Sequence, residues 1–182
     1  MATQREFSIF DLFKFANVNL DPLTETFDTN FYGTYVVTWP DCCQTVFNAM
    51  GTIQGYVLGK IEGRRDDDLA KNWHGHVSAV TVAPEFRREG LARKLMDILE
   101  KITSVIYNGF FVDLFVRATN KVAIALYKAL GYDVYRTVKG YYSSEKGNED
   151  AYEMRKSMPR DTKKECMIAK KKEVNPEELE FA

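Results

Sequence analysis

The sequence predicts a mixed α/β domain in which a sheet carries helices on both faces. Apolar strand patterns alternate with amphipathic helical patterns through the middle of the chain, and strand patterns dominate its ends. The length of 182 residues is typical of one compact domain. A hydrophobic fraction of 45% and an aromatic fraction of 13% are enough for a substantial core.

The first half of the chain is expected to hold two helices and three strands. Phe10, Phe13 and Ala16 recur at helical spacing and predict a helix over Ile9–Asn17, whose N-terminus Asp11 favours. The other expected elements are a strand Arg5–Ser8, a loop 19–26, a helix around Phe31–Val36 that Pro40 stops, and strands Thr45–Ala49 and Ile53–Ile61 joined by a tight turn at Met50-Gly51.

The second half is expected to alternate strands and helices. Asn120 can cap a helix over Lys121–Leu130, and Gly131 suits the position just after it. The remaining elements are strands at Val77–Val82, Phe110–Val116, Asp133–Tyr142 and Ala151–Lys156, and a long helix from about Gly90 to Tyr107 with a buried stripe of Leu91, Leu95, Ile98, Leu99 and Ile102.

Composition separates a predicted domain from a charged C-terminal tail, and it argues against several kinds of function. Residues 1–158 form the predicted domain, and the Lys- and Glu-rich residues 159–182 are expected to be a tail that is disordered or bound to a partner. A net charge of −1 argues against direct binding to nucleic acid or membranes. Cys42, Cys43 and Cys166 lack the number and spacing of a disulfide framework or a metal site. We therefore expect a reduced, soluble, cytoplasmic protein without metal.

The turn after Val77–Val82 is the most informative motif. Its residues are Arg87, Arg88, Glu89, Gly90, Leu91 and Ala92, and it opens directly onto the long helix. Free backbone N–H groups, two arginines and the positive end of a helix dipole there suit a polyphosphate. Neither a Walker turn nor a G-x-G-x-x-G fingerprint is present. The alternative is a solvated basic turn beside an ordinary helix start.

The R-x-x-G-x-A spacing of that turn resembles the pyrophosphate-binding turn of the GNAT acetyltransferase superfamily. The segment Asn120–Tyr132 matches the N-x-x-A-x-x-L-Y-x-x-x-G-[FY] pattern of GNAT enzymes that acetylate protein N-termini. Loop Asn19–Phe27, segment Trp73–Val77, Tyr141-Tyr142 and the specific stretch Gly109–Arg117 narrow the resemblance to NatB-type catalytic subunits. The resemblance covers roughly residues 1–160.

The resemblance implies the GNAT fold, which is a mostly antiparallel, twisted sheet with a splayed pair of parallel strands and helices on both faces. It also implies acetyl-CoA as the acyl donor, with no metal. The strand before the turn would run beside pantetheine, and Asn120 would lie along the cofactor. Tyr127 would sit near the thioester sulfur. The implied cofactor-binding residues are Val80, Thr81, Val82, Arg87, Arg88, Glu89, Gly90, Leu91, Ala92, Asn120 and Tyr127.

The resemblance also implies a substrate, the α-amine of Met in nascent chains that begin Met-Asp, Met-Glu, Met-Asn or Met-Gln. His76 would lie close to the second side chain. The implied substrate-binding residues are Glu25, Phe27, His76, Ala79, Tyr141 and Tyr142. Each has an ordinary structural alternative, such as a turn cap for Glu25 and core or strand packing for the aromatic residues.

Tyr127 and His76 are the candidate catalytic residues. Losing a proton at pH 7 costs about 1 kcal/mol for an α-amine and roughly 4–5 kcal/mol for lysine, so an α-amine needs only a weak base. Strand His74–Val82 contains no Asp or Glu, which favours an α-amine acceptor, with His76, a tyrosine or water as base. Tyr127 is predicted to donate a hydrogen bond to charge developing on sulfur, unless it is only a core residue.

Family resemblance further implies a large helical-repeat auxiliary subunit that docks the enzyme at ribosomes. The aromatic segments Phe10–Phe15 and Phe31–Tyr35 are either its contact surface or intramolecular core. Direct attack by the amine is favoured over an acyl-enzyme on Cys42 or Cys43, which lack an activating context. Two alternative functions are acetylation of lysine or small amines, and a non-catalytic acetyl-CoA-binding subunit.

Overall fold

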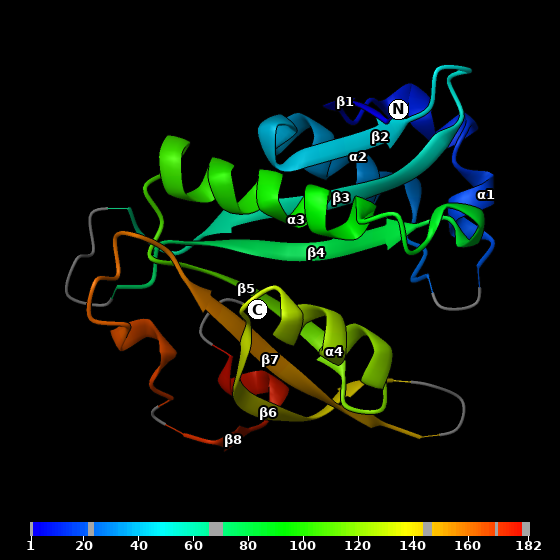
Figure 1. Cartoon of the computed structure of the whole chain (residues 1–182). Helices are drawn as coiled ribbons and strands as arrows, with labels where there is room; N and C mark the ends of the chain where they lie inside the picture. The colour runs from blue at the N-terminus through cyan, green and yellow to red at the C-terminus, as the bar shows by residue number, and fades with distance from the viewer. Residues whose placement is uncertain (1, 22–23, 66–70, 144–146, 170, 180–182) are drawn as a thin grey trace. The chain divides into compact units, whose positions relative to one another are not determined.

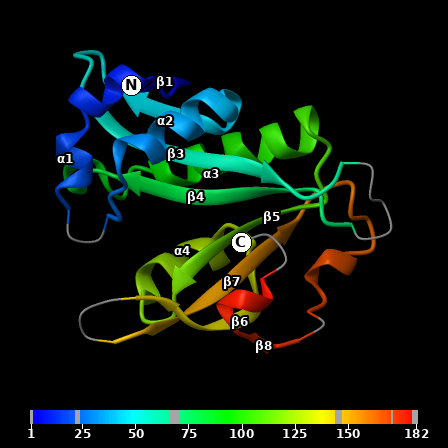
Figure 2. The ribbon, with the colours of Figure 1, turned by 180° about the vertical axis from the view of Figure 1, so that it is seen from behind.

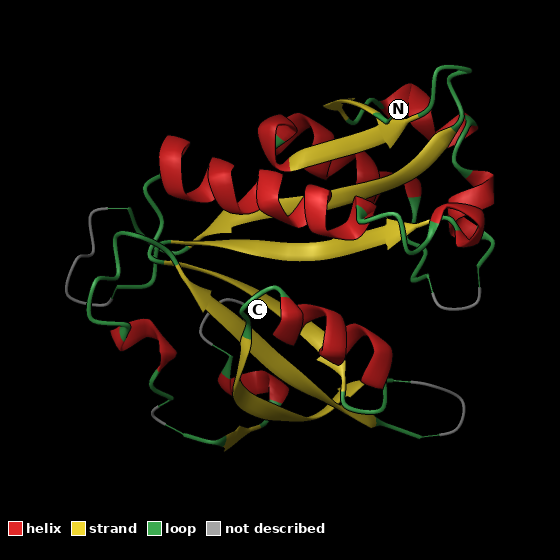
Figure 3. Cartoon of the chain, in the orientation of Figure 1, coloured by secondary structure: helices red, strands yellow, loops and turns green. Residues whose placement is uncertain are grey.

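The chain forms two compact units in the computed structural model, which describes residues 2–21, 24–65, 71–143, 147–169 and 171–179 (Figure 1). The first unit comprises residues 1–61 and 77–102, and the second comprises residues 62–76 and 103–182. Each unit combines strands with helices, as the colours of Figure 3 show. The predicted fold class, a mixed α/β fold on a mostly antiparallel sheet, is confirmed.

Four strands make the sheet of the first unit, in the hydrogen-bonded order β1-β2-β3-β4. These are β1 (Thr3–Glu6), β2 (Cys43–Phe47), β3 (Ile53–Glu62) and β4 (His74–Val82), whose first residues belong to the second unit. β2 is antiparallel to both β1 and β3. Gly51 turns the chain between β2 and β3 at a φ of 80°, a left-handed conformation that glycine adopts without a Cβ penalty.

Helices cover both faces of this sheet. The α-helices are α1 (Ala16–Asn19), α2 (Thr29–Thr38) and α3 (Leu91–Lys101), with 3₁₀ turns at Ile9–Phe13, Pro40–Cys42 and Pro84–Phe86. Figures 1 and 2, seen from opposite sides, show α2 and α3 on opposite faces. Leu95 and Leu99 of α3 are fully buried, as the predicted stripe requires, whereas Ile98 is only half-buried.

Aromatic side chains dominate the core of the first unit. Tyr56 of β3 is fully buried, and its ring lies 5.3 Å from that of Phe7 between centroids. Its hydroxyl donates to Asn19 Oδ1 at 2.8 Å, and Asn19 Nδ2 donates to the hydroxyl of Tyr32 at 3.0 Å. Because buried hydroxyl groups need partners, this chain of hydrogen bonds fixes α1 and α2 against β3.

The second unit is built on strands in the order β5-β7-β6-β8. They are β5 (Phe111–Arg117), β6 (Asp133–Tyr142), β7 (Glu149–Ser157) and β8 (Glu173–Val174). β7 is antiparallel to β5 and β6, whereas β8 adds to β6 in parallel. Helix α4 (Lys121–Ala129) lies on one face, and the last 3₁₀ turn, Pro176–Glu178, lies on the other (Figures 1 and 2).

Two predicted helices differ from the observed ones. The expected helix Ile9–Asn17 is wrong, because it divides into a 3₁₀ turn and α1. The Asp11 carboxylate accepts a hydrogen bond from the backbone N–H of Ser8 at 2.8 Å and also pairs with Arg5. The hydrogen bond to Ser8 caps a short turn. The expected helix to Tyr107 is α-helical only to Lys101, and a π-helical turn follows over Ile102–Ile106.

The C-terminal segment is folded where the structure describes it. Asp161 accepts from the backbone N–H groups of Glu165 and Cys166 at 2.9 and 3.0 Å, and Arg155 donates to the Cys166 carbonyl at 3.2 Å. Val174 of β8 packs against Val138 and Ala151. The division of the chain at residue 159 stays a prediction. None of the helices in the described ranges is long and apolar enough to cross a membrane.

Candidate functional site

The turn that precedes α3 has the backbone of an anion-binding site. Arg88 and Gly90 adopt left-handed conformations, with φ of 67° and 80°. Gly90 is the N-cap of α3, whose first turn carries no acidic side chain. The N–H groups of Leu91 and Ala92 belong to the first turn, where helical N–H groups lack intrahelical acceptors. A would-be Cβ at Gly90 meets nothing within 4 Å, so the residues present fit a phosphate group at this turn.

The two arginines of the turn differ in their contacts. Arg87 Nε donates to the Val82 carbonyl at 3.2 Å, and its terminal nitrogen pairs with the carboxylate of Asp21. Arg87 therefore ties the loop before α2 to the turn. The side chain of Arg88 is exposed, as is that of Glu89. Both arginines are exposed, but the guanidinium of Arg87 is engaged by Asp21 and the Val82 carbonyl.

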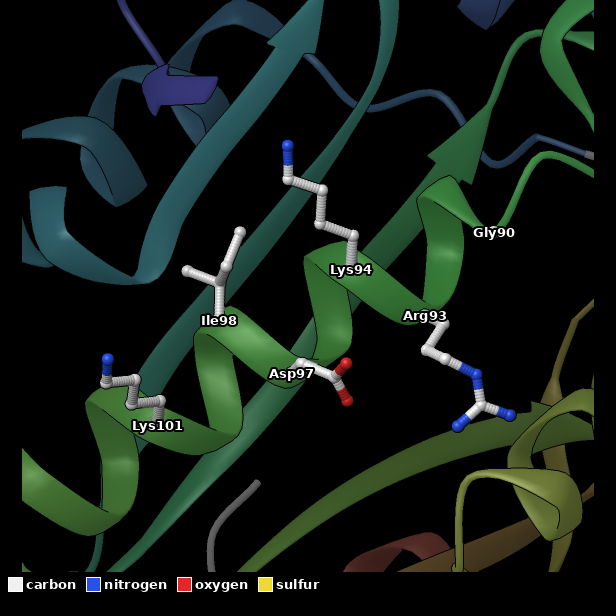
Figure 4. Close-up of a pocket in the computed structure, with 6 residues that line it drawn as sticks. All are labelled: Gly90, Arg93, Lys94, Asp97, Ile98 and Lys101. Atoms are coloured by element: carbon white, nitrogen blue, oxygen red, sulfur yellow. The ribbon is translucent and has the colours of Figure 1, made fainter. Parts of the chain in front are cut away.

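The exposed face of α3 carries a shallow groove that begins at Gly90. Figure 4 shows Lys94, Ile98 and Lys101 on one side of the helix and Arg93 and Asp97 on the other. Three of these side chains are cationic. Two of them, Arg93 and Lys94, lie within one turn of the N-terminus of α3 and add their positive charge to that of the helix dipole.

Strand β4 carries the predicted pantetheine partners in its second half. Val80 and Thr81 are half-buried and Val82 is buried. The hydroxyl groups of Thr81 and Thr24 are 2.7 Å apart, which links the strand to the loop before α2. A Cβ at Gly55 would come within 2.6 Å of the Thr81 carbonyl oxygen, so glycine lets β3 approach closely at this point.

The predicted substrate residues of the first unit lie in or near the aromatic core. Phe27 is half-buried and stacks on Phe31 with ring centroids 4.0 Å apart. Ala79 packs against the same core. The hydroxyl groups of Tyr35 and Ser78 are 2.6 Å apart and share a hydrogen bond. Glu25 is exposed. Phe27 therefore has the packing role that the sequence left open, and it keeps part of its ring accessible.

His76 lies at the start of β4, in the second unit, and has a buried carboxylate partner. Its Nδ1 is 2.7 Å from Asp113 Oδ1 of β5. Burial opposes ionisation of Asp113, but the two imidazoles of His74 and His76 and the guanidinium of Arg155 outweigh it and lower the pKa of this carboxyl. β4 itself contains no carboxylate, as the sequence shows, but the adjacent strand supplies one.

The rings of three aromatic residues, Phe115, Tyr141 and Tyr142, form a series of contacts that begins at His76. The Phe115 ring lies 5.7 Å from the imidazole and stacks on Tyr141 at 4.7 Å between centroids. Tyr141 meets Tyr142 edge to face, and the Arg117 guanidinium lies 4.2 Å over the Tyr142 ring. Tyr141 is 36% exposed, whereas Tyr142 packs against the sheet, as strand alternation predicts.

Asn120 and Tyr127 both belong to α4. Asn120 Oδ1 accepts from the Ala123 N–H at 3.1 Å, which confirms the predicted helix cap, and Gly131 follows the helix at a φ of 91°. Tyr127 is buried, and its ring meets Tyr132 edge to face at 6.0 Å. Burial raises the pKa of Tyr127 to about 12. The phenol therefore keeps its proton at neutral pH and can act as a donor.

The thiols are placed for packing rather than for nucleophilic attack. Cys42, Cys43 and Cys166 are buried, and burial raises the pKa of each to about 12. A thiol with such a pKa is protonated at neutral pH, and the thiolate is the nucleophile. Within the described ranges, no three His, Cys, Asp or Glu side chains gather as they would around a metal ion.

Sequence reasoning missed Asp113, Asp21 and Thr24. Asp113 left a usable signal, because it is the one charged side chain between Phe110 and Val116 in an otherwise apolar strand. A carboxylate there is buried and needs a charged or hydrogen-bonding partner. Asp21 and Thr24 lie in a polar loop and left no such signal.

Comparison with known proteins identifies similar chains. The model of the acetyltransferase (GNAT) family matches residues 9–132. The N-terminal acetyltransferase B complex catalytic subunit of Arabidopsis thaliana is 49% identical over 181 residues, which is 100% of this chain and 99% of that protein. Naa20 of Chaetomium thermophilum, solved with a bisubstrate analogue, shares 45% identity and a TM-score of 0.86 over 96% of this chain and 97% of that one.

A third similar structure is that of the NatB acetyltransferase complex bound to CoA and MES. It shares 42% identity and a TM-score of 0.76, and the match covers 86% of this chain and 99% of that one.

Proposed function

The chain belongs to the GNAT family of acetyltransferases, and from this premise we propose that it is the catalytic subunit of a NatB-type N-terminal acetyltransferase. The observation that carries the proposal is the likeness, over the whole chain, to the NatB catalytic subunit of Arabidopsis thaliana. The enzyme transfers acetyl from acetyl-CoA to the α-amine of the first residue. Its preferred substrates are nascent chains that begin Met-Asp, Met-Glu, Met-Asn or Met-Gln.

The turn before α3 binds the diphosphate of acetyl-CoA. Its left-handed residues Arg88 and Gly90 and the helix N-terminus support this role, together with the outward Arg88 side chain. Arg87 and Glu89 shape the turn. The edge of β4 at Val80–Val82 runs beside pantetheine, and Asn120 lies along the cofactor.

The reaction is a direct attack by the amine nitrogen on the thioester carbonyl. The N–C bond forms, the C–S bond breaks, the amine gives up a proton and the departing thiolate of CoA gains one. Tyr127 donates a hydrogen bond to the sulfur as negative charge develops there. Its raised pKa supports a donor role and argues against the phenol as base, because it remains protonated at neutral pH.

The base for the amine is His76 or a water that it orients. An α-amine loses its proton at a cost of about 1 kcal/mol at pH 7, so an imidazole suffices. The contact with Asp113 supports His76 over a tyrosine, since a carboxylate that accepts from one ring nitrogen leaves the lone pair of a neutral ring on the other, where a base needs it.

Several residues hold the start of the peptide. By the family resemblance, its contacts are Glu25, Phe27, Ala79, Tyr141 and Tyr142. The exposure of Glu25 and Tyr141 and the partly accessible ring of Phe27 support these assignments.

The auxiliary subunit binds the aromatic turn near the N-terminus. Phe10 and Phe13 are 71% and 86% exposed, whereas Phe15 and Tyr35 pack in the core. Exposed apolar side chains that gather in one place mark interaction surfaces, and Phe10 and Phe13 lie in the same 3₁₀ turn, Ile9–Phe13. We expect this subunit to be a helical-repeat protein that places the enzyme at cytoplasmic ribosomes.

One experiment tests the function against its alternatives. The full chain, alone and with the auxiliary subunit, is incubated with acetyl-CoA and a peptide library that varies at the second position, with free or blocked N-termini. Acetylation of free Met-Asp and Met-Glu N-termini supports the proposal. Acetylation of lysine in blocked peptides would favour a lysine acetyltransferase, and acetyl-CoA binding without turnover would favour a non-catalytic subunit.

A second experiment tests the interface. Phe13→Ser removes an exposed ring and is expected to weaken co-purification with the auxiliary subunit while leaving thermal stability unchanged. Val37→Ser is the control, because Val37 is 82% exposed on α2, outside the turn. Equal binding by the Phe13 variant and wild type would refute this surface.

A further inference from the structure

The carboxylate of Asp21 lies against the turn before α3, although Asp21 itself belongs to the loop that joins α1 to α2. Its side chain is 7% exposed, and Oδ2 forms an ion pair with Nη2 of Arg87, 66 positions away in the chain. Little water reaches a carboxylate at this exposure, so the guanidinium replaces water as its partner. The turn before α3 therefore includes a side chain from a distant loop.

A second set of contacts joins the same loop to β4. Thr24 Oγ1 donates to Asp21 Oδ2 at 3.4 Å and lies 2.7 Å from Thr81 Oγ1. A hydroxyl group has one proton to donate and a carboxylate only accepts, so Thr24 accepts a hydrogen bond from Thr81. Asp21 is thus held by β4 as well as by the turn.

Helix α1 fixes the loop where it begins. Asn17 Nδ2 donates to the Ile53 carbonyl at 2.9 Å and to Glu85 Oε1 at 3.2 Å. Glu85 belongs to the 3₁₀ turn Pro84–Phe86, which leads directly into Arg87. Figures 1 and 2 both show α1 beside this segment. Because α1 is bound to the turn, the carboxylate that follows α1 stays within reach of Arg87.

Two contacts hold one edge of the Arg87 guanidinium. Nε donates to the Val82 carbonyl at 3.2 Å, and Nη2 pairs with Asp21. Within the described ranges Nη1 has no hydrogen-bond partner, and the side chain is 37% exposed. The guanidinium is a rigid fork of N–H donors that can bind a phosphate with two parallel hydrogen bonds. Arg87 can therefore bind an anion at its other edge without breaking either contact.

We propose that Asp21 is a positioning residue for the coenzyme, because it holds Arg87 with the open edge of its guanidinium available to the diphosphate of acetyl-CoA. A long, flexible side chain loses conformational freedom when it binds a ligand, and the contact with Asp21 imposes that loss before the coenzyme arrives. This inference rests on the proposed function, in which the turn before α3 binds the diphosphate. It adds a residue from the loop before α2 to the coenzyme site.

The sign of the effect separates positioning from simple charge. Asp21 is an anion close to a proposed anion site, so the loss of its charge alone would strengthen binding of a diphosphate. Loss of positioning weakens binding instead, because CoA must then immobilise the Arg87 side chain. We expect Asp21→Ala to raise the Kd for CoA about fivefold, measured by calorimetry on the full chain with its auxiliary subunit. An unchanged or lower Kd would overturn the proposal.

Asp28→Ala is the matched control. It removes the same charge from the same loop, but Asp28 caps α2 through the backbone N–H of Phe31. Its Kd for CoA is expected to stay within about twofold of wild type. An equal loss of affinity in the Asp21 and Asp28 variants would count against a specific role for Asp21.

A double-mutant cycle tests whether Asp21 acts through Arg87. In an Arg87→Ala background, Asp21→Ala should change the Kd for CoA by less than about twofold, because the side chain that it positions is already gone. Losses of affinity that simply add would contradict the proposal.

S-acetylpantetheine separates positioning from a general loss of structure. This acyl donor carries the thioester but lacks the diphosphate. With a Met-Asp peptide, Asp21→Ala should lower kcat/KM for acetyl-CoA about fivefold and leave kcat/KM for S-acetylpantetheine unchanged. A merely structural role would lower both values equally. Asp21→Asn keeps the shape of the side chain and is expected to show the same discrimination with about a twofold effect, should Asp21→Ala fail to fold.

Failure of the proposed function looks different from failure of this inference. A wild-type complex that binds no CoA would refute the proposed coenzyme site and the function with it. A wild-type complex that binds CoA, together with folded Asp21 variants that bind it equally well, would refute only the role of Asp21.

Discussion

Replacing Gly90 by alanine tests the backbone of the phosphate turn apart from its side chains. Gly90 has a φ of 80°, and a Cβ there meets nothing within 4 Å, so Gly90→Ala adds backbone strain without a steric clash. An L-residue in the left-handed region costs roughly 1–2 kcal/mol. We take about 1 kcal/mol as the net cost, because alanine also restricts the unfolded chain. For a chain of this size the melting temperature should fall by about 2–4 °C.

The same strain should weaken binding of the coenzyme. The total penalty is at most about 2 kcal/mol, so if partial relaxation leaves the free protein with about 1 kcal/mol of it, CoA must supply roughly another 1 kcal/mol to restore the left-handed conformation. That cost raises Kd about fivefold. Calorimetry of CoA binding to the full chain with its auxiliary subunit measures this change, and scanning calorimetry measures the melting temperature.

Gly51→Ala is the matched control. Gly51 has the same φ of 80° and the same open space, but it lies in the β2–β3 turn. It should lower the melting temperature by a similar amount and leave the Kd for CoA unchanged. An unchanged Kd in Gly90→Ala, or an equal loss of affinity in both variants, would refute the assignment of this turn.

Three further predictions follow from the pKa shifts. Tyr127→Phe should lower kcat roughly 10- to 100-fold and leave the Kd for acetyl-CoA unchanged, as steady-state kinetics and calorimetry can check; an unchanged kcat would remove Tyr127 from the mechanism. Asp11→Asn should lower the free energy of unfolding by about 1 kcal/mol at pH 7, since the pairing with half-exposed Arg5 outweighs burial and lowers the Asp11 pKa. That lowered pKa stabilises the protein above about pH 4, so urea titrations should show the difference from wild type shrinking as the pH falls below 4. Cys42 and Cys43 should resist alkylation at pH 8 until the chain is unfolded, because burial raises their pKa to about 12; mass spectrometry that finds native labelling, or a stable acetyl-enzyme, would contradict this.

Elements with strong local signals were predicted closely. Strand β6 has the predicted bounds, Asp133–Tyr142, and α4 begins after the predicted cap, Asn120. A cap bond, a glycine with positive φ and an apolar alternation each involve residues only a few positions apart. Such features depend little on contacts with distant parts of the chain.

Elements that depend on distant contacts were predicted less well. The apolar stripe of α3 continues past Lys101, but the α-helix ends there. Thr103 of the π-helical turn is buried against Gly75 and Gly109, where an added Cβ would lie 2.2 and 2.7 Å from its side chain. Helical periodicity does not reveal such a fit, because the partners are far away in the sequence.

The sequence by itself predicted the turn at residues 87–92, the strands and helices around it and the family pattern, because each rests on short-range chemistry. Only the tertiary structure decided that Asp113 holds His76 and that Asp21 holds Arg87. These partners are 37 and 66 positions apart in the chain. Packing decides which distant charges meet and how far water is excluded from them, and neither can be read from residues that are neighbours in the sequence.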